Sequence, residues 1–159
     1  VLTKLAQDST STVKSVVFGN PSTPMAIRVS LVPNLRHGQK ENLVTMGGDR
    51  IPPEILAALA TDPDKFLRFC VGGNTRTPVD TLRKLSEDKD GRKGVACNPA
   101  TPQEILGMLV DKALQETDRD LASRLLQNPN LKRETRDRFL CFPGSDSGLL
   151  RSAIQWSPQ

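Results

Sequence analysis

Apolar residues recur along the chain in short stripes that have helical spacing. The clearest stripe is Ile-Leu-x-x-Leu-Val at 105–110. Intervals of three and four residues place its side chains on one face of an α-helix. The same frame occurs in full or in part at three other places, namely 2–6, 55–60 and 82–85. The pattern predicts a series of amphipathic helices, each with one face turned towards a core.

A short motif precedes the apolar stripes and divides the chain into repeats. It reads Asn-Pro-Ala-Thr-Pro at 98–102, with related copies at 20–24 and 74–78. The prolines that align between units are 28, 26 and 24 residues apart: Pro24, Pro52, Pro78 and Pro102. Asn128-Pro129 marks one further unit. An array of this kind buries one continuous core and leaves two long faces free, which favours a binding scaffold over a single catalytic pocket.

Each unit is predicted to contain a helix, a turn, a second and shorter helix, and another turn. The second helix is indicated by apolar pairs with helical spacing before the asparagine, such as Leu67 and Val71. Thr101 and Glu104 form the pattern of a capping box, with a proline between them at the first helical position. A unit of 24 residues is too short for two helices of about 11–12 residues each. The second helix is therefore expected to have one or two turns, of α or 3₁₀ type.

Two stretches carry the most specific motifs in the chain. They are Thr-Pro-Gln-Glu-Ile-Leu-x-x-Leu at 101–109 and Leu-Arg-x-x-Val-x-x-Asn-x-x-Thr-Pro at 67–78. These motifs resemble the repeats of the leucine-rich repeat variant family, and the resemblance covers about residues 1–130. It implies an all-α fold, a right-handed superhelical solenoid similar to armadillo and HEAT arrays. In that fold each unit pairs an α-helix with a short 3₁₀ helix.

The cysteines depart from the pattern of that family. Some of its members carry an N-terminal cysteine cluster that binds an iron–sulfur centre, whereas Cys70, Cys97 and Cys141 are isolated from one another. We therefore expect no cofactor. Cys70 and Cys97 adjoin apolar residues and are predicted to be small core residues rather than reactive thiols. An odd number of cysteines without paired spacing indicates a reducing compartment, so a cytoplasmic location is expected.

The repeats do not account for the whole chain equally well. About five to six of them are expected over residues 1–133, followed by a C-terminal capping segment at 134–159 that contains Trp156. The unit at about 25–51 is irregular because Pro33 interrupts its helical pattern. It is either a decayed repeat or a functional insertion. The first unit begins halfway through its pattern, so residues upstream of it are expected to have been removed.

The net charge of +4 draws attention to three basic residues. Each lies six positions before the asparagine of its unit, and together they form what we call the basic ladder: Lys14, Arg68 and Arg92. In one interpretation the basic ladder lines one face and binds a partner. In the other, each member pairs with an acidic group of the adjoining unit, such as Asp62, Asp64 or Asp88. Elsewhere the charges alternate within single turns, which is typical of solvated helix faces.

The recurring asparagines also have two interpretations. They are Asn20, Asn74, Asn98 and Asn128. Their amides are either available in a groove that binds an extended peptide, or they satisfy backbone groups in turns and caps. Their position before proline or threonine favours the structural role, for which Asn98→Ala is the test.

Evidence for catalysis in the sequence is weak. His37 is the only histidine, and a single histidine forms neither a triad nor a multi-ligand metal site. The leading hypothesis is a non-enzymatic scaffold that binds a protein or peptide along one face. The alternative is a sequence-tolerant nucleic-acid binder that uses the basic ladder on phosphates, although aromatic residues are few. In a third hypothesis, the chain has no partner of its own and only stacks inside a longer array of repeats. No apolar run approaches the roughly 20 residues needed to cross a membrane.

Overall fold

The computed structural model describes residues 1–141, except for the side chains of residues 49, 140 and 141. Within this part there are eleven α-helices and no strands: α1 (Leu2–Leu5), α2 (Ser11–Gly19), α3 (Met25–Leu31), α4 (His37–Met46), α5 (Pro53–Leu59), α6 (Lys65–Gly73), α7 (Val79–Glu87), α8 (Gly91–Cys97), α9 (Gln103–Gln115), α10 (Arg119–Leu126) and α11 (Arg133–Asp137). Three short 3₁₀ segments accompany them: η1 (Val32–Asn34), η2 (Gly48–Arg50) and η3 (Arg138–Cys141). The fold of the described residues is therefore all-helical, as expected.

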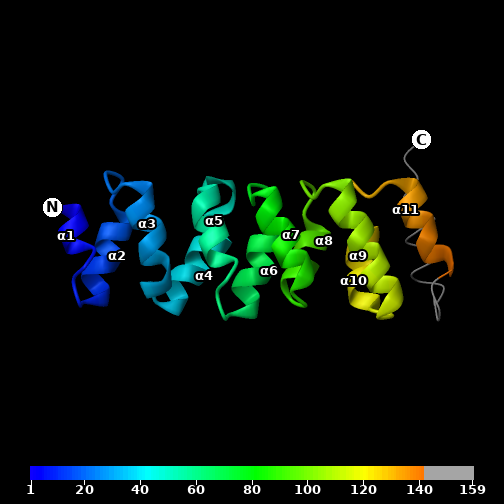
Figure 1. Cartoon of the computed structure of the whole chain (residues 1–159), viewed down its shortest axis with the longest axis horizontal. Coiled ribbons are helices and arrows are strands. Elements are labelled where there is room, and N and C mark those ends of the chain that lie inside the picture. The colour runs from blue at the N-terminus through cyan, green and yellow to red at the C-terminus, as the bar shows by residue number, and fades with distance from the viewer. Residues whose placement is uncertain (142–159) are drawn as a thin grey trace.

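The helices follow one another along the long axis of the molecule, with α1 at one end and α11 near the other (Figure 1). Each helix packs mainly against elements that are close to it in the chain. Among the even-numbered helices α6 contacts α8, and α8 contacts α10. Among the odd-numbered helices α3 contacts α5, and α7 contacts α9. Contacts between elements that are close in the sequence are typical of repeated helix pairs.

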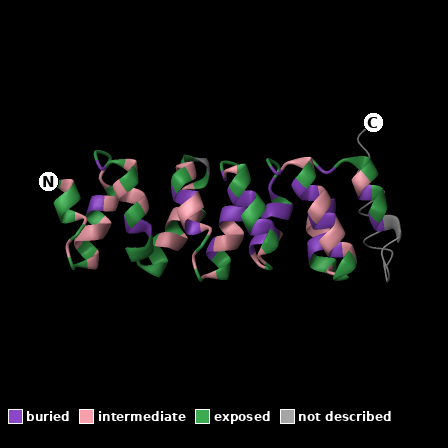
Figure 2. Ribbon diagram, viewed as in Figure 1, coloured by how far each residue is buried: buried purple, intermediate pink, exposed green. Residues whose placement is uncertain are grey.

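The core lies between the two sets of helices and consists of the predicted stripes. The apolar positions of 55–59, 82–85 and 105–110 are buried in α5, α7 and α9. Buried residues run through the middle of the array and are denser from α5 to α10 than at the N-terminal end (Figure 2). The stripe at 2–6 forms α1 but contains no buried residue, and Leu5 is 41% exposed. Helical spacing alone therefore did not predict which stripes are covered.

The second helix of each unit is an α-helix, which corrects the 3₁₀ element implied by the family resemblance. These helices are α6 with nine residues, α8 with seven and α10 with eight. A seven-residue α-helix makes about two turns, so the expected length was right. The second helix is shorter than the first in the pairs α7–α8 and α9–α10, as expected, but longer in the pair α5–α6.

The predicted capping box at the start of α9 is also wrong. Pro102 is the N-cap residue, and no side chain caps the helix. The hydroxyl of Thr101 instead donates to the carbonyl oxygen of Val95, 2.7 Å away at the end of α8. Glu104 pairs with Arg83 of α7 at 2.8 Å. The Val95 carbonyl also accepts from the N–H of Asn98 at 3.2 Å, so the Thr101 hydroxyl adds a second donor to a carbonyl in the last turn of α8.

The irregular unit at 25–51 keeps the helix pair and adds two 3₁₀ turns. Pro33 lies in η1, directly after α3, so it ends the helix without removing an internal hydrogen bond. Gly48 begins η2 with a positive φ of 46°, which glycine adopts at little cost. The predicted capping segment reaches α11 and η3, but residues 142–159, which include Trp156, lie outside the described part of the chain.

Candidate functional site

The structure connects two members of the basic ladder to carboxylates of the following unit. The Nε atom of Arg68 lies 3.0 Å from Oδ1 of Asp88, as the pairing interpretation expected. Arg92 is only 4% exposed, and it contacts Glu116 at 2.5 Å and Asp118 at 3.1 Å. Sequence reasoning did not name those two acids as its partners. The charges of Arg68 and Arg92 are therefore largely satisfied within the molecule.

Lys40 of α4 occupies the corresponding position in the irregular unit, and sequence reasoning missed it. Its ammonium nitrogen lies 2.6 Å from Asp62 of the next unit, and both side chains are mostly buried. The residue six positions after Lys40 is Met46, so the spacing to an asparagine that marks the other units is absent here. Leu43 was the available signal, because it follows Lys40 by three residues just as Val71 follows Arg68.

Lys14 differs from the other basic residues at this position. Its Nζ atom donates to Oδ1 of Asn34 at 3.1 Å, and no carboxylate in the described residues forms an ion pair with it. Arg36 is similar, because its Nε atom donates to the hydroxyl of Ser11 at 3.3 Å. The corresponding cations in other units are paired with carboxylates. The side chains of Lys14 and Arg36 beside α2 are not.

The carboxylates that receive these cations have lowered pKa values. The Arg92 guanidinium donates to Glu116 and holds the pKa of that carboxyl below its usual range. Burial raises the pKa of Asp118, but the N–H of Leu121 and the Arg92 guanidinium outweigh it, so the net direction is downward. Asp62 and Asp88 follow the same pattern with Lys40 and Arg68. Such pairs stabilise the fold above the ordinary carboxyl pKa, and this stability is lost as the pH falls through the lowered values.

The recurring asparagines tie successive turns together. The Nδ2 atom of Asn98 donates to the carbonyl oxygens of Gly72 at 2.9 Å and Asn74 at 2.7 Å, while its Oδ1 accepts from the N–H of Ala100 at 2.8 Å. Asn128 repeats this arrangement one unit later. Asn98 and Asn128 are at most 1% exposed, so their amides are not available to a bound peptide. The structural interpretation of the asparagines is confirmed at these two positions.

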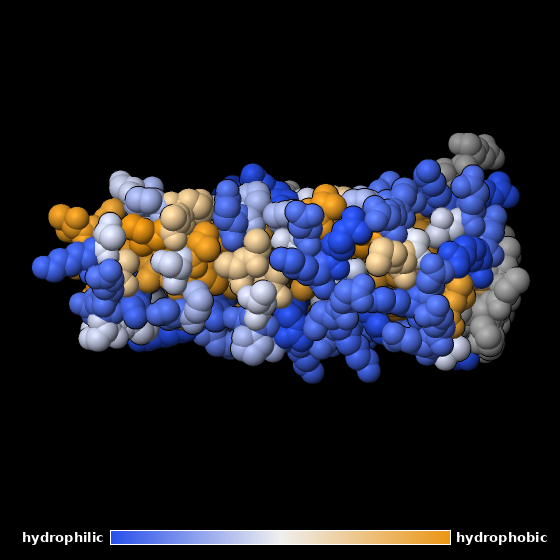
Figure 3. Space-filling model, viewed as in Figure 1, coloured by the Kyte–Doolittle hydropathy of each residue, from blue (hydrophilic) through white to orange (hydrophobic). Residues whose placement is uncertain are grey.

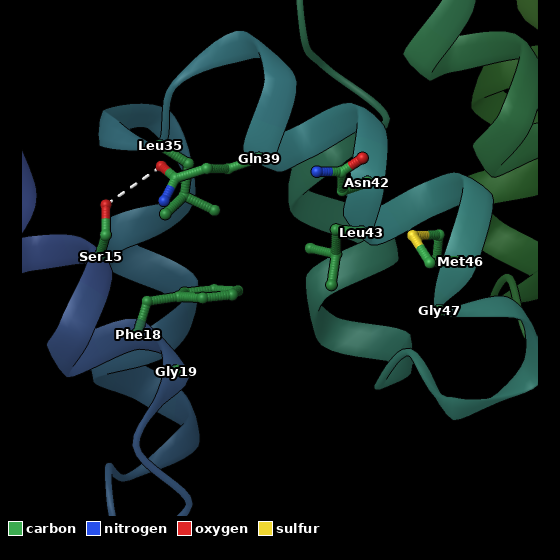
Figure 4. Close-up of a pocket in the computed structure, with 9 residues that line it drawn as sticks. All are labelled: Ser15, Phe18, Gly19, Leu35, Gln39, Asn42, Leu43, Met46 and Gly47. Carbon is green, nitrogen blue, oxygen red and sulfur yellow. Dashed lines mark hydrogen bonds between the residues drawn. The ribbon is translucent and has the colours of Figure 1, made fainter.

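An open apolar groove lies between α2 and α4. It has a volume of about 500 Å³. Phe18 of α2 and Leu43 of α4 point towards each other across it, and Leu35 and Met46 complete its apolar lining (Figure 4). Met46 is 82% exposed. Apolar residues gather at the surface over the part of the array formed by α1 to α4 (Figure 3).

The groove is open because α2 and α4 lack the close glycine contacts that join α6 to α8. A Cβ atom on Gly72 of α6 would lie 2.7 Å from the carbonyl oxygen of Gly91, and one on Gly94 of α8 would lie 2.0 Å from that of Phe69. These backbones therefore touch directly. By contrast, a Cβ atom on Gly19 of α2 would meet no atom within 4 Å.

Polar residues close one end of the groove. The hydroxyl of Ser15 donates to Oε1 of Gln39 at 3.0 Å and so connects α2 to α4 (Figure 4). The same oxygen accepts from the backbone N–H of Arg36 at 3.0 Å. Arg36 and Lys14, the neighbour of Ser15, therefore lie at this end. A further cation, Arg28, places its guanidinium 5.3 Å from the ring centre of Phe18, where it is attracted by the ring face.

The other candidate residues do not form a recognisable reaction centre. His37 lies at the start of α4, within 3.4 Å of Glu41 and 3.2 Å of Asp64. Cys70 is half-buried, and burial raises the pKa of its thiol. Cys97 is exposed, so its predicted core position is wrong: it ends α8 on the solvent side, where Arg124 contacts its sulfur at 3.6 Å.

The described residues form neither a metal-ion cluster nor a helix that could span a membrane. The side chains that the structure describes include no group of three or more histidine, cysteine, aspartate or glutamate residues that could hold a metal ion. None of the helices in this part of the chain combines the length and apolar character required to cross a membrane. The groove between α2 and α4 is the candidate site that the described residues offer.

The chain was compared with protein-family models, curated proteins and solved structures. No family model, curated protein or solved structure matches it. Its function must therefore be inferred from its own geometry.

Proposed function

We propose that this chain is a non-enzymatic helical-repeat scaffold that binds a protein or peptide partner in the groove between α2 and α4. The observation that carries this proposal is the groove itself, an apolar opening in an array whose corresponding α6–α8 contact is closed by glycines. Its volume of about 500 Å³ falls within the range of about 300–1,000 Å³ for sites that hold small ligands. Exposed apolar lining gains free energy when a partner covers it.

The proposal includes the finer features expected from the sequence. The array is proposed to be a right-handed superhelical solenoid of the leucine-rich repeat variant type, supported by the repeated motifs and by helix contacts that are local along the chain. The irregular unit at 25–51, which supplies α4 and part of the groove, is proposed to be a functional insertion. A cytoplasmic location is supported by the free thiols of Cys70 and Cys97.

Partner binding through the groove has better support than nucleic-acid binding through the basic ladder. Phosphate binding requires free cations, whereas Arg68 and Arg92 already contact carboxylates. Lys14 alone of the basic ladder lacks such a partner among the described residues. It lies beside the groove and therefore belongs to the proposed site.

Selection from a displayed peptide library against the full chain tests the proposal. Recovered peptides are measured by fluorescence anisotropy on the wild type and on Gly19→Leu, which fills the groove without a clash at Cβ. Gly107→Leu on α9 is the matched control, because its added Cβ also meets nothing within 4 Å. We expect Gly19→Leu to weaken binding by at least about tenfold and Gly107→Leu to leave it unchanged. Failure to recover peptides, or equal binding to both variants, would contradict the proposal.

A further inference from the structure

We infer that the partner segment recognised by the groove combines apolar anchor residues with an acidic flank, and that Lys14 and Arg36 read the acidic flank. This inference rests on the proposed function and adds the chemistry of the partner. It concerns one end of the groove, where the hydrogen bond between Ser15 and Gln39 closes the apolar lining.

The groove floor selects apolar side chains. Phe18, Leu43 and Leu35 present carbon atoms from two helices and the segment between them. Met46 lies at the open side and is 82% exposed. A methionine side chain is unbranched and polarizable, so it can adapt to anchor residues of different shape. Burial of this surface supplies affinity but does not by itself choose one apolar sequence over another.

The positive charges beside the groove distinguish between partner segments that have similar apolar residues. The side chains of Lys14 and Arg36 donate to the neutral oxygens of Asn34 and Ser11, and the described residues contain no ion pair for either cation. The corresponding cation in each of the next three units does have a carboxylate partner: Lys40, Arg68 and Arg92. The groove is therefore located where the pattern of internal neutralisation is interrupted.

The two carboxylates near Lys14 and Arg36, those of Asp8 and Glu41, contact other groups. Asp8 accepts from the backbone N–H of Thr10 at 2.7 Å, and its pKa is lowered chiefly by that hydrogen bond, with only a small part from the charge of Lys14. Glu41 of α4 faces His37 at 3.4 Å. Arg28 adds a third positive charge behind Phe18, where its Nε atom donates to the carbonyl oxygen of that residue at 3.0 Å. An acidic flank meets a complementary potential here, while a basic flank is repelled.

The test uses two synthetic peptide libraries that share randomised apolar positions, one flanked by glutamates and the other by lysines. They are mixed in equal amounts and selected on the full wild-type chain. We expect glutamate flanks to be enriched by about tenfold, because each rim charge changes affinity only modestly. The double variant Lys14→Glu/Arg36→Glu is expected to reverse the preference. The preference should also weaken at high salt, because exposed charges are screened.

Lys84→Glu/Lys89→Glu is the matched control, since it makes the same change in net charge at two exposed lysines away from the groove. It should keep the preference for glutamate flanks. Circular dichroism of every variant establishes that the helices are retained. The inference is overturned if both flanks are recovered equally, or if the preference survives the reversal at Lys14 and Arg36.

The design separates this inference from the proposed function. If peptides with both flanks bind and Gly19→Leu removes the binding, the groove binds peptides and only the acidic preference is wrong. If binding is insensitive to Gly19→Leu, the proposed function itself fails. A labelled single-stranded RNA is tested in parallel. Binding of that RNA that requires Lys14 and Arg36 but is unaffected by Gly19→Leu would replace the peptide with a nucleic acid and overturn the inference.

Discussion

The side chain of Asn98 has two structural roles: it forms a local turn and it hydrogen-bonds to the preceding unit. Its Oδ1 atom forms a local turn with the N–H of Ala100, and its Nδ2 atom reaches the carbonyls of Gly72 and Asn74 in the preceding unit. Asn20 makes the local bond, to the N–H of Ser22 at 2.8 Å, at a half-buried position. The two residues therefore differ in the bond to the preceding unit.

Replacement of Asn98 by alanine is expected to cost about 3 kcal/mol of unfolding free energy, because the three hydrogen bonds of its buried side chain are lost together. Asn20→Ala should cost only about 1 kcal/mol, since its local bond is partly exposed. Urea unfolding of both variants measures the difference. Equal losses would mean that the bonds to the preceding unit contribute little. Asn98→Asp keeps the local acceptor and places a carboxylate against two carbonyls, so it should be destabilising at neutral pH and less so in acid.

At the residue scale the sequence predicted the structural role of a side chain better than its hydrogen-bond partners. The structural role of Asn98 was expected from the proline that follows it, whereas the bond from Thr101 to Val95 replaced an expected cap. The bond from Thr101 stays within one copy of the repeated motif, and the same bond recurs in two other copies. The carbonyls that Asn98 reaches lie 24 and 26 residues before it, in the preceding unit, and no local motif contains them.

At the scale of elements, α6 and α8 differ from α2 and α4 in how closely two neighbouring helices approach. Gly72 and Gly94 allow the backbones of α6 and α8 to touch. The corresponding helices α2 and α4 leave a groove lined by Phe18 and Leu43. The same kind of helix pair is therefore closed at one place and open at another, depending on the side chains at the contact.

Gly94→Ala tests the closed contact. The added Cβ would lie 2.0 Å from the carbonyl oxygen of Phe69, so α8 must move away from α6. We expect a loss of about 3 kcal/mol in unfolding free energy. Gly107→Ala is the control in the middle of α9, where nothing lies within 4 Å, and it should stabilise the chain by up to about 1 kcal/mol. A tolerated Gly94→Ala would mean that the two helices do not pack this closely.

At the scale of the whole molecule, burial is unevenly distributed along the array. Five of the seven residues of α8 are buried, whereas α2 has one buried residue and α4 has none. The helices that form the groove therefore have fewer buried residues to hold them than α8 has. Because the helix contacts are local along the chain, each helix depends mainly on its immediate neighbours.

Native-state hydrogen exchange is expected to follow this distribution. Amides of α2 and α4 should exchange at least about tenfold faster than those of α8 and α10, because few buried contacts oppose their local opening. A peptide that occupies the groove should slow exchange in α2 and α4 and leave α10 unchanged. Uniform protection along residues 1–141 would show that the array unfolds as one cooperative unit and would contradict this expectation.

The sequence by itself determined the helical class, the repeated motif and the apolar stripes of α5, α7 and α9, because helical periodicity and turn chemistry are local properties. Only the tertiary structure decided which cations are neutralised, which stripes are covered and where a groove remains. Arg92 and Lys14 occupy the same position in their units, yet one contacts Glu116 and Asp118 while the other contacts Asn34. The physical reason is that charge pairing and close packing depend on residues a full unit away, which local periodicity does not specify.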